Sequence, residues 1–284
     1  MKSFGQEFYP YESIRAIKLA DKSKASDRHA LIERIAAQLP QASSHTRLRI
    51  ATKFVQRYLI GTRREITPPP HCQSFVRLVA RLRHTPTQIE LLYLRLAKTD
   101  KIVGAIAREL FYPVCIAGRP PDGFSSAEFA ARNGGQLLAM SPLLTRAFIC
   151  HYAKTRWNFH DHATIDRSLR VLQGAGLIAR ERMPELRRHP TAFRLSQHNI
   201  SLVTFVYAVY DEFLLQIMAG NFTLARGVVP ITDFARSFLL TPAQVEEHCE
   251  AARRHQLIAQ HGDQWRFVFG DLDVLVDTLL SKAL

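Results

Sequence analysis

The spacing of apolar and polar positions predicts a mainly helical chain. Over residues 43–61 (SSHTRLRIATKFVQRYLIG) the apolar residues recur every three or four positions, which is the period of an amphipathic helix. The stretches SFVRLVARL, IELLYLRLA and KIVGAIARELFYPV continue this pattern. Thr85 and Gln88 have the spacing of a capping box before IELLYLRLA. We therefore expect residues 1–117 to form a helical bundle.

A second region begins after the turn-rich GRPPDG, with a short helix in SSAEFAARN. A longer helix is expected to open at Ser141 and Pro142, and a third helix at Asp161 or Thr164, ending at Gly176. Two predicted strands follow, LIARER and TAFRLS. Three helices and a β-hairpin are the order of a winged helix-turn-helix, which we predict for residues 118–200.

The last region repeats this order. An apolar helix over 201–219 is expected to link the two parts, and Asp211 and Glu212 near its centre favour a buried helix over a membrane span. A second capping box is predicted in Thr-Pro-Ala-Gln at 241–244, then a hairpin turning at His-Gly-Asp and a closing amphipathic helix. The predicted fold is thus a helical bundle followed by two winged units, in three domains: 1–117, 118–200 and 201–284.

Charge separates these regions. The chain carries a net +13, but residues 1–200 hold 32 basic and 15 acidic groups, whereas residues 201–284 hold 6 and 10. The basic part favours an anionic partner, duplex DNA first and RNA as an alternative. Glu246, Glu247 and Glu250 on the third helix of the last unit oppose docking on phosphate. We expect that unit to bind protein partners or to mediate dimerisation, and a homodimer stays open.

The third helix of a winged unit enters the major groove, and its hairpin lies on the backbone or in the minor groove. Arginine and glutamine on that helix suit guanine and adenine, and wing arginines suit phosphate. The alternative is a basic solvent-exposed face or a winged unit that contacts protein. The candidate DNA-binding residues of the winged unit are Asn158, Thr164, Arg167, Arg170, Gln173, Arg180, Arg182, Arg187 and Arg188. The bundle adds two basic stripes, Arg49, Lys53 and Arg57, and Arg77 and Arg81.

Catalytic chemistry has little support in the sequence. His160 and His162 could be metal ligands, but a catalytic zinc needs a third ligand and no spacing supplies one. Nucleotide-binding glycine loops, the serine nucleophile elbow and H-E-x-x-H are also absent from the sequence. We expect no enzyme, no cofactor and no metal, with a metal-dependent nuclease as the less favoured alternative. Scattered cysteines and an N-terminus without an apolar leader favour the cytoplasm.

Several stretches resemble a known family. The segments SSHTRLRIATKFVQRYL and IELLYLRLAKTDKIVGAIAREL, then SSAEF, then Trp157 before HDHATIDRSLRVLQGAGLI, are similar to the BrxA proteins of bacteriophage-exclusion (BREX) defence systems, over roughly residues 25–178. The resemblance implies a helical part like the antitermination factor NusB, DNA binding and no catalysis. The leading hypothesis is a DNA-binding accessory protein of a phage-defence system. The alternative is a winged-helix transcriptional regulator or plasmid replication initiator.

Overall fold

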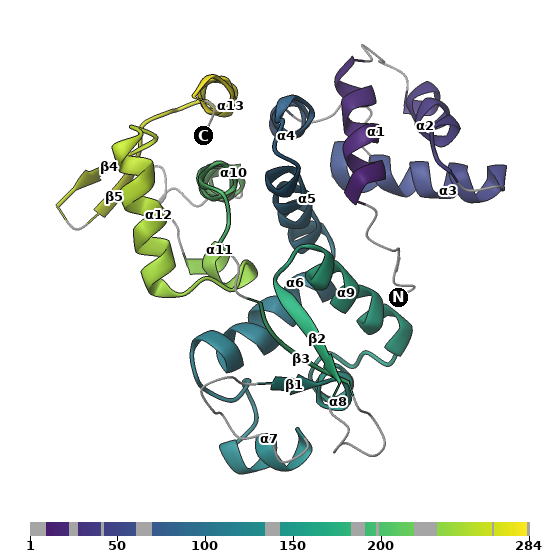
Figure 1. The fold of residues 1–284 in the computed structure, drawn as a ribbon, viewed down its shortest axis with the longest axis vertical. Helices are drawn as coiled ribbons and strands as arrows, with labels where there is room; N and C mark the ends of the chain where they lie inside the picture. Colours follow the sequence, from purple (N-terminus) through teal and green to yellow (C-terminus); the bar gives the residue numbers. More distant parts are fainter. Residues whose placement is uncertain are drawn as a thin grey trace. The chain divides into compact units, whose positions relative to one another are not determined.

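The computed structural model describes residues 10–22, 28–40, 43–60, 70–133, 143–182, 191–196, 199–218, 232–262 and 264–282. Within this part the chain is mainly helical, with one three-stranded and one two-stranded antiparallel sheet (Figure 1). None of the described helices combines the length and the apolar character needed to cross a membrane. The chain divides into two compact units.

The first unit takes its described residues from 100–199 and 231–245. Its strands pair in the order β1-β3-β2, with Leu144 and Arg180 both opposite Phe193. Its elements are α6 (Lys101–Ala105), the π-helical η2 (Ile106–Ile116), α7 (Ser126–Arg132), β1 (Leu143–Thr145), α8 (Arg146–Arg156), α9 (His162–Gly174), β2 (Ile178–Arg182), β3 (Thr191–Leu195), α11 (Thr232–Ser237) and the start of α12 (Pro242–Arg254).

The helix expected to open at Ser141 begins later. Ser141 and Pro142 lie outside the described residues, and Leu143–Thr145 is a strand paired with β3. The helix α8 starts only at Arg146, because Thr145 is extended and its side chain accepts a hydrogen bond from the Phe148 N–H. The apolar pair Leu143 and Leu144 therefore serves the sheet and not the helix.

The segment η2 is part of the core of this unit. Ile106, Leu110, Phe111 and Val114 are fully buried. The segment packs against α9, α11 and β3. Residues 100–117 therefore belong with the sheet and its helices, whereas the sequence placed them in the N-terminal bundle. The boundary differs because an apolar helix carries no information about which distant element it packs against.

The second unit takes its described residues from 9–99, 200–230 and 246–284. Its strands β4 and β5 form an antiparallel hairpin. Its elements are α1 (Pro10–Lys22), α2 (Arg28–Ala37), α3 (Ser44–Phe54), the π-helical η1 (Val55–Ile60), α4 (Pro70–Arg81), α5 (Thr85–Thr99), α10 (Leu202–Met218), the rest of α12, β4 (Ile258–His261), β5 (Gln264–Phe267) and α13 (Leu272–Ser281).

The centre of the second unit is α5. Every residue from Leu91 to Ala97 is buried, as expected for a helix covered on all sides. The capping box predicted for Thr85 and Gln88 is wrong. The Gln88 side-chain amide instead donates to the carbonyls of Val79 (2.7 Å) and Leu82 (2.9 Å). It thereby satisfies carbonyls that the C-terminal end of α4 leaves without intrahelical partners.

The C-terminal segment completes this unit. The helix α10 packs on α5, and α13 packs on α4 and α10. Lys98 of α5 forms a largely buried ion pair with Asp211 of α10 (2.6 Å) and contacts Glu212 at 3.3 Å. This pairing with Lys98 explains how an apolar helix accommodates two carboxylates near its centre. Residues 201–284 are therefore not a separate domain in the described structure, because α10 and α13 share a core with residues 9–99, whereas α11 belongs to the first unit.

Candidate nucleic-acid interface

The helix α9 is fixed at both ends. At its N-terminus Asp161 accepts hydrogen bonds from the backbone N–H (3.2 Å) and hydroxyl (2.6 Å) of Thr164. These bonds lower the pKa of the Asp161 carboxyl. At its C-terminus Gly176 has a φ of +76°, and the Leu177 N–H donates to the Leu172 carbonyl at 3.0 Å. This is a Schellman ending, and it confirms both predicted helix ends.

The orientation of α9 against α8 is set by an ion pair that the sequence alone did not reveal. The Arg146 guanidinium of α8 donates two hydrogen bonds to the Asp166 carboxylate of α9, at 2.6 and 2.8 Å. This pairing lowers the pKa of Asp166. A bidentate pair fixes direction as well as distance, so α9 is held rigidly on α8. The signal in the sequence was two opposite charges on the helices flanking a predicted turn.

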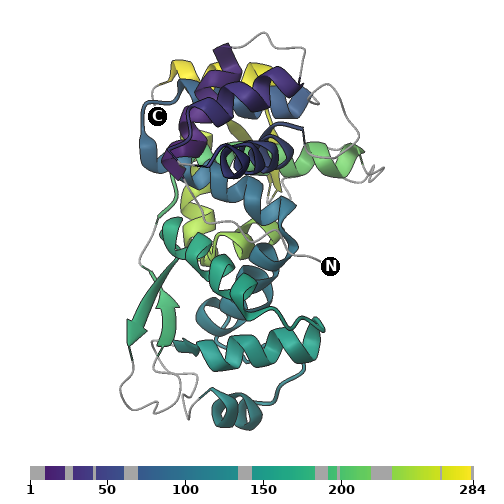
Figure 2. The ribbon, with the colours of Figure 1, turned by 90° about the vertical axis from the view of Figure 1, so that its right-hand side faces the viewer.

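The buried face of α9 is the predicted one. Ile165, Leu169 and Leu172 are at most 1 % exposed. The helix α9 packs against α8 and β2, and Figure 2 shows the hairpin β2–β3 beside these helices. Because the apolar stripe faces the core of the unit, the side chains on the opposite face point away from it. The scaffold therefore offers one exposed helical face beside one hairpin.

The candidates on α9 differ in accessibility. Arg170 is exposed and Gln173 is half-buried. Thr164 is only 1 % exposed and its hydroxyl bonds Asp161 and Arg167, so its predicted contact with DNA is not supported. Arg167 folds back along the helix, where it donates to the Thr164 hydroxyl at 2.8 Å and lies 3.7 Å from the Asp161 carboxylate. It is bound to the helix start instead of projecting from it.

The hairpin places two basic side chains together. Arg180 and Arg182 are both exposed on β2, and their spacing of two puts them on one face of the strand. Arg180 also donates to the Thr191 hydroxyl of β3 at 3.2 Å. Arg194 of β3 forms an ion pair with Glu181, which neutralises charge on the other face. The loop candidates Arg187 and Arg188 lie outside the described residues.

His160 and His162 flank Asp161 at the start of α9. Asn158 adopts a left-handed conformation (φ +49°), and its side-chain carbonyl lies 3.1 Å from His160 Nε2. Asp161, between the two histidines, is the helix cap. Within the described residues, no three His, Cys, Asp or Glu side chains are grouped closely enough to hold a metal ion. In the described structure the His-Asp-His stretch is thus part of the turn that leads into α9.

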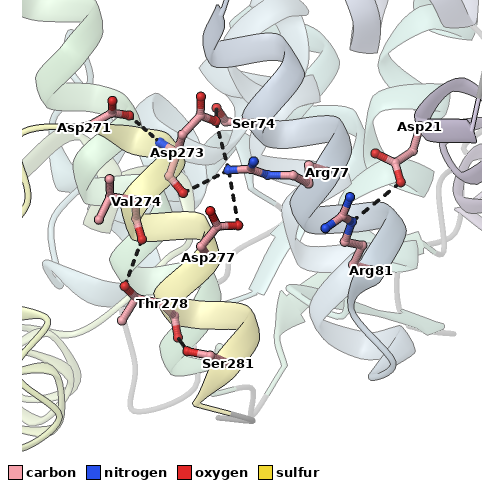
Figure 3. Close-up of polar contacts among 10 residues, drawn as sticks. All are labelled: Asp21, Ser74, Arg77, Arg81, Asp271, Asp273, Val274, Asp277, Thr278 and Ser281. Carbon is pink, nitrogen blue, oxygen red and sulfur yellow. Dashed lines mark hydrogen bonds and ion pairs between the residues drawn. The ribbon is translucent and has the colours of Figure 1, made fainter. Parts of the chain in front are cut away.

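The basic stripes of the predicted bundle are only partly exposed, and they lie in the second unit. On α3, Arg49 is exposed and Lys53 half-buried, whereas the side chain of Arg57 lies outside the described part. Arg77 of α4 donates to the backbone and carboxylate of Asp273 (2.9 and 3.0 Å), and it lies 3.5 Å from Asp277 (Figure 3). Its expected role on nucleic acid is therefore not supported by its contacts, since α13 already neutralises it.

Two neighbours of Arg77 on α4, Ser74 and Arg81, also contact acidic residues. Ser74 donates to the Asp273 carboxylate at 2.5 Å, which fixes that carboxylate beside α4. Arg81 is 58 % exposed and lies 3.8 Å from Asp21, a distance at which an exposed pair contributes little. Along the sequence, Arg77 and the two aspartates of α13 fall in separate basic and acidic regions. The structure brings them into contact because α13 folds back onto α4.

The structure thus groups Arg170, Gln173, Arg180 and Arg182 on adjoining elements of the first unit. It assigns Thr164 and Arg167 to the local structure of α9. Comparison with known proteins gives no match: no protein-family model, no curated protein and no solved structure matches this chain.

Proposed function

We propose that this protein is a non-enzymatic, cytoplasmic DNA-binding protein, which docks on duplex DNA through α9 and the hairpin β2–β3. The proposal rests on one observation: these two elements expose basic side chains and are held by a rigid scaffold. Arg170 projects from a helix that is capped at both ends and ion-paired to α8, and Arg182 lies on the adjacent hairpin. Rigid presentation is what geometry-dependent recognition of a groove requires.

The order of elements supports a winged helix-turn-helix for this module. A short helix, a strand, two helices and a hairpin follow one another as α7, β1, α8, α9, β2 and β3, and the sheet order is β1-β3-β2. In that fold the second helix of the helix-turn-helix enters the major groove, and the hairpin lies along the backbone. The helix α9 is in the groove-reading position and β2–β3 is the wing.

The wider role that we propose follows the resemblance to BrxA proteins: an accessory protein of a bacterial phage-defence system. Proteins of that system would bind the acidic surface of α12, where Glu246 and Glu247 are exposed. A transcriptional regulator or replication initiator is the second candidate. It is favoured by the recurrence of a helix followed by a hairpin in α12 and β4–β5, since paired winged modules suit both roles.

The test is a salt-titrated binding assay with the full-length protein on labelled duplex DNA, single-stranded DNA and RNA. The wild type should bind duplex DNA with a steep salt dependence. Replacing both arginines in R170Q/R182Q should lower the slope of log K against log salt by about two, one for each phosphate that the variant no longer neutralises. R254Q/R266Q removes two exposed arginines of the second unit and is the matched control.

The control variant should bind within about two-fold of the wild type, because its arginines lie outside the proposed interface. Equal weakening in both double variants would contradict a localised interface and leave only nonspecific attraction to the positive chain. Tighter binding to RNA than to duplex DNA would replace the proposed partner. Retained binding by R170Q/R182Q would reassign this module to protein contacts.

A further inference from the structure

A cluster of arginines lies beside the turn that leads into α9. Arg119, in the loop after η2, donates to the Asp122 carboxylate at 2.7 Å. Arg156, the last residue of α8, lies against the same loop: a Cβ atom on Gly123 would be only 2.8 Å from the Arg156 guanidinium carbon. Gly123 also has a φ of +86°, which favours glycine. The loop 119–123 therefore holds two guanidinium groups close together.

A third arginine approaches from α11. The Arg236 guanidinium lies 5.8 Å from the centre of the Tyr112 ring of η2, and a hydrogen bond from Arg108 to Ser237 (3.3 Å) holds α11 on η2. Asp122 has its pKa lowered by the hydrogen bond and charge of Arg119, and the charges of Arg156 and Arg236 add to this effect. All three arginines thus act on one carboxylate.

The cluster carries more positive charge than negative charge. Neither Arg156 nor Arg236 forms an ion pair with any residue in the described part of the chain. Asp122 itself is 76 % exposed, so its carboxylate can be displaced from Arg119 while the core packing stays intact. With the Glu109 carboxylate beside Trp157, three cations lie near two carboxylates, and the remaining positive charge attracts a further anion.

Aromatic packing makes the base of the cluster rigid. The Phe124 ring stacks on Tyr152 with centres 5.8 Å apart, and Tyr152 meets Trp157 edge-on at 5.3 Å. The Trp157 indole N–H donates to the Glu109 carboxylate at 2.8 Å. These contacts fix the backbone on both sides of the cluster, at Gly123 and at Arg156. The arginines therefore stand on a preformed surface.

We propose that Arg119, Arg156 and Arg236 bind the phosphodiester backbone of nucleic acid, as a second contact beyond α9 and the wing. A phosphate oxygen would take the place of Asp122 on Arg119, and the planar guanidinium groups can each donate two parallel hydrogen bonds to phosphate. The cluster adjoins α9, because Arg156 and His162 are the two ends of one short turn. This inference rests on the proposed function, and it names further residues that hold the same partner.

The experiment compares R156Q/R236Q and D122N with R254Q/R266Q in full-length protein, in salt-titrated binding to labelled duplex DNA. R156Q/R236Q should weaken binding about ten-fold and lower the salt slope by about two. D122N should strengthen binding a few-fold, because it removes the carboxylate that competes for Arg119. A merely structural role for the cluster does not predict this gain. R156K, which keeps the charge without the planar fork, should retain the slope with weaker affinity.

The possible failures are distinguishable. If R170Q/R182Q weakens binding but R156Q/R236Q behaves like the control, the second contact is overturned and the proposed function stands. If the wild type binds no nucleic acid, both are overturned. Stabilisation by inorganic phosphate that R156Q/R236Q abolishes, with unchanged DNA binding, would assign the cluster to a small phosphorylated ligand and also overturn the inference. Thermal melting of each variant checks that these exposed substitutions leave the fold intact.

Discussion

The module formed by α9 and β2–β3 and the module formed by α12 and β4–β5 have matching local structure and opposite surface charge. Both helices contain 13 residues, and α12 starts at Pro242 as α9 starts at His162, so equivalent positions are 80 residues apart. In each, a hairpin begins four residues after the helix ends. The two modules therefore allow the determinants of fold and of surface to be compared position by position.

The buried positions and the helix ends agree. Ile165 corresponds to Val245, and both are buried. The ending of α9 at Leu177 recurs at Leu257, whose N–H donates to the Ala252 carbonyl at 2.9 Å. Thr241 and Gln244 form the predicted capping box, with bonds of 2.9 and 3.2 Å. Apolar stripes and caps are thus sufficient to specify this local structure twice.

The positions outside the buried stripe do not agree. Arg167 and Arg170 of α9 correspond to Glu247 and Glu250 of α12, so the charge is reversed at both positions. Arg253 of α12 forms an ion pair with Glu250 at 2.8 Å instead of adding to a basic face. The buried stripe therefore determines the module, whereas the charge of the outer face can change without changing the module.

The largest expected difference between the two modules is in the free energy of unfolding that is lost when a core residue is truncated. Leu169 of α9 and Cys249 of α12 occupy equivalent buried positions, 1 % and 0 % exposed. L169A should destabilise the protein by about 2–5 kcal/mol, because it removes three buried carbons and leaves a cavity. C249A removes one sulfur atom and should cost about 1 kcal/mol. Chemical denaturation followed by circular dichroism measures both, and equal costs would show that the second module is packed as tightly as the first.

The ion pair of Arg146 and Asp166 should contribute about 1–2 kcal/mol at neutral pH, after allowance for its partial exposure. The folded pKa of Asp166 is lowered by Arg146, so this stabilisation is complete above the unfolded value of about 3.9 and is lost as the pH falls through the folded pKa. The difference in unfolding free energy between wild type and D166N should shrink accordingly.

The matched variant is E246Q, since exposed Glu246 occupies the equivalent position on α12. It should change stability by less than about 0.5 kcal/mol at any pH. A pH-independent cost of D166N would mean that shape, and not charge, accounts for the contribution of Asp166.

The smallest effect concerns the helix endings. Gly176 and Gln256 are equivalent and both left-handed, with φ of +76° and +57°. G176A should cost about 1 kcal/mol through backbone strain alone, because no atom lies within 4 Å of the added methyl group. Q256G should stabilise the second module by up to about 1 kcal/mol for the same reason. Thermal melting of the two variants should therefore shift in opposite directions, and a shift in the same direction would contradict the shared ending.

Sequence patterns predicted the local structure well and the long-range contacts poorly. The cap at Asp161, the ending at Gly176 and both hairpins were predictable, because each depends on residues within a few positions of one another. The capping of α4 by Gln88 and the neutralisation of Arg77 by Asp273 were not, because they join segments that the sequence does not relate. Arg167 is a different case, because its partner Thr164 is only three residues away and the helical pattern alone did not show that the side chain bonds there.

The most direct test of the central claim exchanges the charges of the two modules. R170E gives α9 the charge that α12 has at the equivalent Glu250, and E250R gives α12 the charge of α9. Duplex binding should fall about ten-fold for R170E at moderate salt, because a like charge then faces the phosphates. E250R should bind at least as tightly as the wild type. If R170E retains wild-type affinity while its melting temperature confirms folding, α9 does not contact DNA and the account is wrong.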